Sequence, residues 1–250
     1  MDAPDTRSMS KIKTLSVLVP AYNEERTIGP MLEKVVSITR DERFRILAEN
    51  LEIVVVDDGS KDGTADIVRN LISNCDSCRI VLASQPNGGK GTAIRKAISM
   101  ACGDVMVVQD ADLEYDPDDF MVMLPFIVSG EYEVVYGSRF LNHQNKHSYS
   151  SFYLGGRLVS LTANILYGLN LTDEPTCYKM FTREVADSIT LKCKGFEFCP
   201  EFTAKVTKAG YKIQEVPIHY YPRSIEEGKK INWKDGVEAV WTLLKYRFVK

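Results

Sequence analysis

Short runs of apolar, largely β-branched residues alternate with stretches of helical periodicity over the first half of the chain. The apolar runs cover 15–19, 52–56, 79–83, 105–108 and 134–136, and the helical stretches cover 26–39, 64–73, 90–100 and the residues after 117. Near-continuous apolar strands separated by helices are typical of a parallel sheet that is covered on both faces. The pattern predicts an α/β fold with a doubly wound, mostly parallel sheet flanked by helices.

Polar residues follow each apolar run, at the point where the predicted strand ends. They occupy 20–24, 57–60, 87–91, 110–112 and 137–139. In a doubly wound sheet, ligands bind outside the carboxyl ends of the strands. We therefore expect these five segments to meet at one edge of the sheet and to form an active site there.

Two carboxylates one residue apart, Asp110 and Asp112, directly follow the apolar run 105–108. Burying a carboxylate is costly unless a positive group meets it, so the pair suggests a bound divalent cation. A hard cation held by only one or two protein carboxylates usually shares a phosphate with the substrate. This arrangement points to an enzyme that acts on a nucleotide or a sugar nucleotide.

Two other phosphate-binding motifs are excluded by the residues themselves. In the glycine-rich segment 88–92, Lys90 precedes Gly91 where an ATPase-type loop has Ser or Thr, and no GxGxxG motif follows the first strand. Lys90 therefore has two open interpretations. It could meet a phosphate, or it could belong to an ordinary turn that leads into a helix.

The second half of the chain is less regular. A polar loop over 142–151 precedes an apolar stretch, 152–171, whose glycines and polar residues predict an amphipathic or interfacial helix. No run of 18 or more apolar residues occurs, so no membrane-spanning helix is expected. Because no flexible linker is evident, we expect a polar tail at 1–13, one main domain at 14–222 and a basic, amphipathic segment at 223–250.

Charge narrows the choice of partners. The 250 residues carry a formal net charge of −3, which argues against a nucleic-acid partner. Residues 223–250 nevertheless contain seven Lys or Arg against four Asp or Glu, together with Trp233 and Trp241. Such a segment suits a phosphate-rich ligand or a membrane surface, and it equally fits an amphipathic helix packed on the domain.

Six cysteines occur in a chain whose polar first residues lack the apolar core of a signal peptide, which predicts a reducing, cytoplasmic location. Cys75 and Cys78 form a CxxC pair without a second pair. The spacing therefore disfavours a structural zinc site.

Four ordered motifs carry a family resemblance. They are VLVPAYNEE at 17–25, VVDDGSKDGT at 55–64, DAD at 110–112 and YGSR at 136–139. With these motifs the chain resembles the family 2 inverting glycosyltransferases of the GT-A fold, over roughly residues 15–250. It looks most like the polyprenyl-phosphate hexosyltransferases, which include dolichyl-phosphate mannose synthase. The resemblance implies a GT-A domain with a C-terminal helical elaboration.

The resemblance also implies roles for individual residues. The positions that match a nucleoside pocket are Pro20, Tyr22, Glu24, Val56 and Asp58; Lys90, Asp110 and Ala111 are added as contacts of the ribose and phosphates. Asp112 and Glu114 match the positions that hold Mg²⁺ or Mn²⁺. Arg139 matches the basic residue near the donor phosphates, while Arg223 and Lys229 match a spaced pair that clasps phosphate, with Lys230 as a further candidate.

We therefore expect a metal-dependent enzyme that transfers a hexose from a UDP- or GDP-sugar to a polyprenyl phosphate, peripherally at the cytosolic face of a membrane. The loop at 87–95 resembles that of glucosyl-type relatives and leaves the donor open. One alternative acceptor is a glycan hydroxyl, with Asp173 as the base that takes its proton; Asp173 equally suits a turn before Pro175. A non-catalytic module that binds nucleotide sugars is a second alternative.

Overall fold

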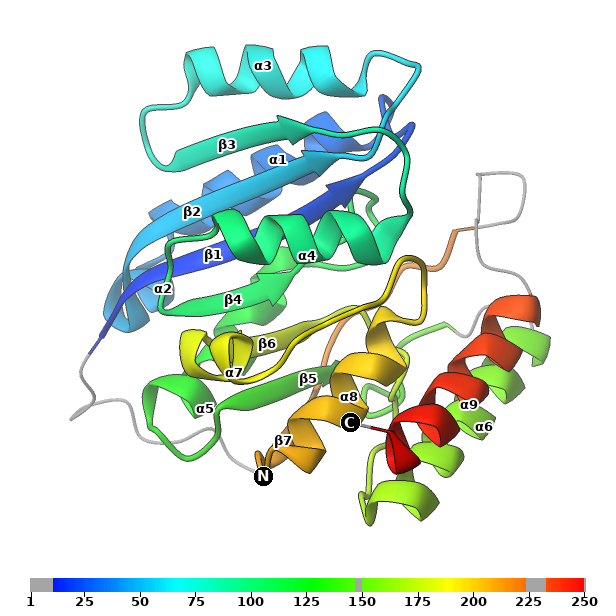
Figure 1. The fold of residues 1–250 in the computed structure, drawn as a ribbon. Coiled ribbons are helices and arrows are strands. Elements are labelled where there is room, and N and C mark those ends of the chain that lie inside the picture. Colours follow the sequence, from blue (N-terminus) through cyan, green and yellow to red (C-terminus); the bar gives the residue numbers. More distant parts are fainter. Residues whose placement is uncertain (1–10, 147–149, 224–232, 250) are drawn as a thin grey trace.

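The computed structural model of this chain describes residues 11–146, 150–223 and 233–249 (Figure 1). Seven strands in this part of the chain form one sheet, in the order β3-β2-β1-β4-β6-β5-β7. Their bounds are β1 (Ile12–Ala21), β2 (Ala48–Asp57), β3 (Arg79–Ser84), β4 (Val105–Val108), β5 (Val134–Ser138), β6 (Lys179–Thr182) and β7 (Ile213–Pro217). The five predicted strands are therefore present as β1 to β5.

The sheet is parallel except at β6. Strand β1 pairs in parallel with β2 and β4, β2 with β3, and β5 with β7. Strand β6 lies between β4 and β5 and runs antiparallel to both. The prediction of a mostly parallel α/β sheet is confirmed, and the reversed strand is a feature that the apolar runs did not reveal.

Helices cover both faces of the sheet (Figure 1). The α-helices are α1 (Ile28–Ser37), α2 (Glu42–Leu47), α3 (Thr64–Asn74), α4 (Lys90–Met100), α5 (Phe120–Val128), α6 (Ser150–Tyr167), α7 (Arg183–Ser188), α8 (Phe198–Lys208) and α9 (Trp233–Phe248), and two 3₁₀ turns, η2 (Ile38–Arg40) and η3 (Pro117–Asp119), adjoin α1 and α5. Buried side chains of α1, α2, α3 and α5 form one core cluster with the sheet, and those of α4, α7 and α8 form a second cluster on the opposite face.

Alternation along each strand divides the side chains between these two cores. In β1, Val17 and Val19 belong to the first cluster and Leu18 to the second. Helix α1 meets the first cluster with a stripe at helical spacing, Ile28, Met31, Leu32 and Val35. Full burial of one such side chain stabilises the fold by about 1.5–3 kcal/mol, so the two cores hold the strand ends in fixed positions.

Helices α6 and α9 lie side by side at one end of the molecule (Figure 1). They share a small core of Val159 and Ala163 from α6 with Ala239 and Leu243 from α9, and both also contact α8. The expected helix at 152–171 and the expected C-terminal helix are thus both present. Within the described residues, no helix is long and apolar enough to cross a bilayer. Strand β1 begins at Ile12, two residues before the expected start of the main domain.

Candidate active site

The carboxyl edge of the sheet opens into a cavity of about 1110 Å³. All five polar segments that were expected to meet at this edge contribute residues to its wall. From the candidates named above, the lining residues are Pro20, Tyr22, Glu24, Asp58, Lys90, Asp110, Ala111, Asp112, Glu114, Arg139 and Arg223. The topology therefore gathers at one place residues that are up to two hundred positions apart in the sequence.

Asp58 holds the glycine-rich turn that leads into α4. Its carboxylate accepts hydrogen bonds from the backbone N–H groups of Gly88 (2.9 Å) and Gly89 (2.7 Å) and from the Gln85 side-chain amide (2.7 Å). Gly89 has a φ of +92°, and a Cβ there would lie 2.5 Å from the carbonyl oxygen of Lys194. Only glycine fits this position without strain, and the turn it allows brings Lys90 to the cavity.

Lys90 forms a partly buried ion pair in the cavity wall. Its Nζ lies 2.5 Å from Asp110 Oδ1 and 2.7 Å from Cys177 Sγ. Burial acts against both charges, but the attraction between them outweighs it. The pKa of Lys90 is therefore raised well above its ordinary value, and the pKa of Asp110 is lowered. Both groups are therefore charged at neutral pH.

Three carboxylates converge on the guanidinium and backbone of Arg223. Arg223 Nη2 lies 2.5 Å from Asp112 Oδ2 and Nη1 lies 3.4 Å from Glu24 Oε2, while the Arg223 N–H donates to Glu114 Oε1 at 2.7 Å. The Nε of Arg223 is buried without a hydrogen-bond partner in the part of the chain that is described. The acidic pocket thus attracts a cation, and in this structure an arginine of the chain supplies it.

The acidic pocket fits a divalent cation that is shared with a ligand. Burial raises the pKa of Asp112 to about 7, with the neighbouring Asp110 and Glu114 charges adding to the shift and Arg223 opposing it. Among the described residues, no three His, Cys, Asp or Glu side chains are placed to hold a metal alone. Mg²⁺-type sites commonly use one or two carboxylates with substrate phosphates and water, and Asp112 with Glu114 would supply that number.

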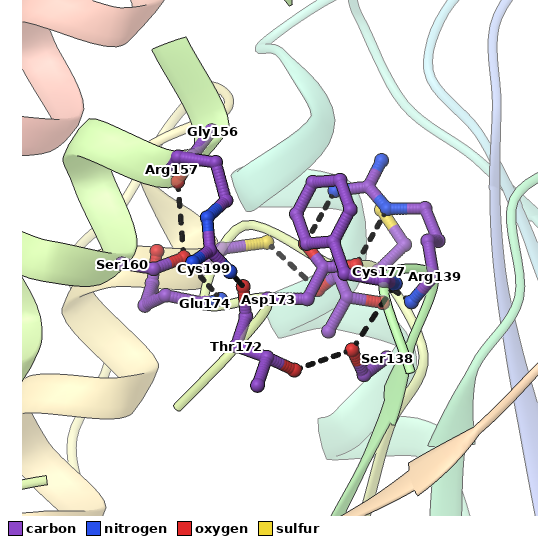
Figure 2. A network of polar contacts seen from close by, with 12 residues as sticks. Ser138, Arg139, Gly156, Arg157, Ser160, Thr172, Asp173, Glu174, Cys177 and Cys199 are labelled. Atoms are coloured by element: carbon purple, nitrogen blue, oxygen red, sulfur yellow. Dashed lines mark hydrogen bonds and ion pairs between the residues drawn. The ribbon is translucent and has the colours of Figure 1, made fainter. Parts of the chain in front are cut away.

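Arg139 is fixed by Asp173, as Figure 2 shows. Asp173 Oδ2 accepts from the Arg139 N–H (2.9 Å) and Nε (2.7 Å), and Oδ1 accepts from Nη2 (2.7 Å). Glu215 in turn accepts from the N–H groups of Thr172 (2.6 Å) and Asp173 (2.9 Å). The Asp173 carboxylate is fully buried, whereas the Arg139 side chain is 20% exposed and lines the cavity.

The same network ties the segment 172–178 to helix α6 (Figure 2). Arg157 Nη1 donates to the Thr172 carbonyl oxygen at 3.3 Å, and the Glu174 N–H donates to Ser160 Oγ at 2.9 Å. Ser160 Oγ also donates to the carbonyl oxygen of Gly156 at 3.0 Å. Helix α6 therefore supports the loop that orients Arg139.

Beyond the charged pocket, the cavity has an apolar arm between α6, α8 and α9. Its wall is mostly aliphatic and aromatic and includes Phe140, Tyr153, Leu158, Val159, Pro175, Phe196, Phe198, Pro200, Trp233, Val237 and Val240. One cavity thus joins a site for charged groups to a site for apolar ones.

Comparison with known proteins identifies the family. Residues 16–190 match the family model described as glycosyl transferase family 2. The chain belongs to glycosyl transferase family 2. It is therefore a glycosyltransferase, as the four motifs predict.

Relatives of this glycosyltransferase include a dolichyl-phosphate beta-glucosyltransferase of Trichomonas vaginalis, 32% identical over 239 residues, which are 92% of this chain and 72% of that protein. A dolichyl-phosphate beta-glucosyltransferase of Dictyostelium discoideum is 29% identical over 251 aligned residues, covering 94% of this chain and 74% of that protein. Glucosyl-3-phosphoglycerate synthase of Mycobacterium tuberculosis, solved with Mn²⁺, UDP-glucose and phosphoglyceric acid, has a TM-score of 0.67 at 19% identity and covers 95% of this chain and 81% of its own. The GT-A fold is thereby confirmed.

The geometry of this glycosyltransferase corrects two expectations. The side chain of Val56 is fully buried and does not line the cavity, because it lies inside β2 and packs under α4. Asp173 does not reach the cavity either, since all its described contacts hold Arg139 and the surrounding loop. Lys229 and Lys230 lie outside the described residues.

Several residues around the site of the glycosyltransferase were not found from the sequence. Cys177, Phe196 and Tyr220 line the cavity, and Glu215 holds the loop behind Arg139. Phe196 lies under Lys90, with Nζ 5.6 Å from the ring centre, and Tyr220 lies 5.2 Å from the Arg139 guanidinium carbon. For Glu215 the sequence did offer a signal, because it is the single acidic residue in the mostly apolar stretch 213–218.

The CxxC pair shows no sign of a metal site. Cys75 and Cys78 have their sulfur atoms 3.6 Å apart at the end of α3, and both are free thiols. The described residues offer no additional ligand there.

Proposed function

We propose that this glycosyltransferase transfers glucose from UDP-glucose to a polyprenyl phosphate, with Mg²⁺ or Mn²⁺ at Asp112 and Glu114, at the cytosolic surface of a membrane. The observation that carries the proposal is the single cavity that joins the acidic and basic pocket to an apolar arm. A polyprenyl phosphate has one phosphate and a long apolar chain, so it matches both parts. The names of the relatives in Trichomonas and Dictyostelium support the acceptor and the sugar.

The donor would lie over the strand ends. Pro20, Tyr22 and Asp58 line the end of the cavity nearest β1 and β2, where we place the nucleoside. Lys90 and Arg139 are cationic groups within reach of the same space, and their charges would stabilise the diphosphate. When bound, a divalent cation at Asp112 and Glu114 would neutralise the negative charge that develops on the leaving nucleoside diphosphate.

The acceptor needs little acid–base help. A phosphate monoester already carries negative charge at neutral pH, so its oxygen can attack the anomeric carbon of the sugar without losing a proton to a base. The bond between that carbon and the diphosphate oxygen breaks as the new bond forms on the opposite face. What the enzyme must provide is positive charge to bring two anions together, and the presence of Arg139 and Arg223 in the cavity wall supports this role for them.

A glycan hydroxyl as acceptor is less well supported. That reaction would require a base at the cavity, and the carboxylate expected in this role, Asp173, is fully buried against Arg139. Of the acidic groups that line the cavity, Glu24 and Asp112 pair with Arg223 and Asp110 pairs with Lys90, while Asp58 is held by the turn at Gly88 and Gly89. The geometry therefore favours an acceptor that is already ionised.

Transfer of labelled sugar tests the proposal. The purified chain is incubated with UDP-glucose or GDP-mannose, a short-chain polyprenyl phosphate in detergent, and Mn²⁺, Mg²⁺ or EDTA. We expect a glucosyl lipid from UDP-glucose that forms only with the metal and is lost in Asp112→Asn. Transfer to a saccharide hydroxyl, with no lipid product from any donor, would contradict the proposed acceptor, and full activity in EDTA would contradict the metal.

A further inference from the structure

Most of the large apolar side chains that are exposed in the described structure gather on two neighbouring helices. On α6 they are Leu154, Leu158, Leu161 and Ile165, which are 55–73% exposed and follow one another at spacings of four, three and four residues. Such spacing places them in one stripe along the helix. The stripe lies opposite Val159 and Ala163, which face the shared core with α9.

Helix α9 carries a matching stripe. Trp233, Val237, Trp241, Leu244 and Phe248 repeat every three or four residues and are 37–83% exposed. Because α6 and α9 share a core and both also pack on α8, each stripe lies on the side of its helix that is turned away from the shared core. We call the nine side chains of these two stripes the α6–α9 face.

The charge around this face differs from that of the whole chain. The described parts of the two helices carry four positive and two negative side chains. They are Arg157, Lys234, Lys245 and Arg247, and Asp235 and Glu238. The whole chain has a formal net charge of −3. Apolar stripes with tryptophans and a basic surround are the composition of helices that lie in a membrane interface.

The cavity opens on this face. Leu158, Trp233 and Val237 belong to the α6–α9 face and also line the apolar arm of the cavity. A ligand whose apolar part is embedded in whatever covers the face could therefore reach the charged pocket without crossing water. This continuity favours a lipid surface over a protein as the occupant.

We propose that the α6–α9 face docks on the surface of a phospholipid bilayer, with the two stripes in the acyl boundary and the basic residues at the lipid phosphates, and that an apolar substrate enters the cavity from the bilayer past Leu158, Trp233 and Val237. Only the identity of that substrate rests on the proposed function. A second copy of the chain fits less well, because two faces with the same excess of positive charge would repel each other.

Vesicle sedimentation tests the docking without donor or acceptor. The full chain is spun with vesicles of phosphatidylcholine alone or mixed with phosphatidylserine. We expect binding that is stronger with phosphatidylserine and weaker in high salt, and that falls at least about tenfold in Leu161→Glu/Ile165→Glu and in Trp241→Glu. These three residues do not line the catalytic cavity. The matched control is Ile46→Glu, which is 49% exposed on α2, and it should bind like the parent chain.

Two further measurements separate the outcomes. Transfer to a short-chain acceptor in detergent should be unchanged in the face variants, which shows that they fold. The docking proposal is overturned if the parent chain does not bind vesicles, or if the parent and the face variants bind them equally. Neither result would contradict the transfer reaction. Sedimentation in solution checks self-association: a dimer that the same variants dissociate, with no vesicle binding, overturns the lipid assignment. Absence of any lipid product, with docking preserved, would instead contradict only the proposed function.

Discussion

Substitution of Asp173 by Asn separates a positioning role from a base role. Asp173 is fully buried and accepts three hydrogen bonds from Arg139. The amide keeps the shape and one acceptor oxygen, but it removes the charge and turns a donor toward the guanidinium. Removing one partner of a buried ion pair costs about 3–5 kcal/mol, because the other charge is left without compensation.

That cost is measurable in a chain of this size. Each kcal/mol lowers the melting temperature by about 2–4 °C, so the cost of about 3–5 kcal/mol should lower that of Asp173→Asn by roughly 6–20 °C. The transfer rate should also fall, by about 10²–10³-fold if Arg139 loses its alignment with the donor phosphates. Thermal or urea unfolding and the transfer assay are run on the same preparations.

A double-mutant cycle with Arg139→Met decides between the roles. If Asp173 serves Arg139, the double variant should regain most of the lost stability, since no unpaired charge remains, while activity stays low. A coupling free energy below about 0.5 kcal/mol would refute this reasoning. So would an Asp173→Asn variant that keeps its full stability and loses only transfer to hydroxyl acceptors, since that is the behaviour of a base.

Three other perturbations probe the charged pocket and its turn. Mn²⁺ affinity in the absence of nucleotide should weaken about tenfold from pH 8 to pH 6, because Asp112, with a pKa of about 7, must lose its proton to bind metal; this is read by calorimetry. Arg223→Met should bind Mn²⁺ more tightly than the parent chain yet transfer sugar more slowly, because the guanidinium that neutralises Asp112 is removed. Gly89→Ala should lower the free energy of unfolding by about 1–3 kcal/mol or more and raise the KM for the donor, since φ is +92° and a Cβ meets the Lys194 carbonyl.

Matched controls keep these outcomes interpretable. Asp112→Asn should remove the pH dependence of Mn²⁺ binding, and a parent chain whose affinity is flat between pH 6 and pH 8 contradicts the assignment. Arg69→Met changes an exposed arginine paired with Asp66 and should leave Mn²⁺ affinity unaltered. Gly130 also has a positive φ, but a Cβ there would meet no atom within 4 Å. If Gly130→Ala lost as much stability as Gly89→Ala, the contact between a Cβ at position 89 and the Lys194 carbonyl would not be the cause.

The gathering of polar residues at the carboxyl edge of the sheet was predictable from the sequence because its signals are local. Each polar segment begins within four residues of the end of an apolar run. The rule that parallel strands present their carboxyl ends at one edge is enough to bring Asp58, Lys90, Asp110 and Asp112 together. Val56 was assigned to the pocket because a matched motif does not say how far along the strand the covering helix reaches. In the structure Val56 lies inside β2 under α4, whereas Asp58 lies just beyond the end of the strand and lines the cavity.

The arrangement around β6 and Asp173 was harder to predict from the sequence, because its contacts link segments that are distant in the chain. Strand β6 has four residues, too few for a pattern, and its first residue is a fully buried lysine. Lys179 is accommodated because its Nζ lies 3.4 Å from the centre of the Tyr136 ring and donates to the Glu174 carbonyl oxygen. No pattern in the sequence around Lys179 predicts these partners. Strand β6 and the contacts of Asp173 are therefore seen only in the tertiary structure.

The reversed direction of β6 brings one more segment of the chain to the cavity. Its neighbours deliver their carboxyl ends to the cavity, whereas β6 delivers its amino end, so the segment 172–178 reaches the site without sharing a loop with β1, β2 or β4. Within this segment, Cys177 Sγ lies 2.7 Å from Lys90 Nζ, and the Asp173 carboxylate holds Arg139. A single substitution in this short segment can therefore shift two cations of the charged pocket at once.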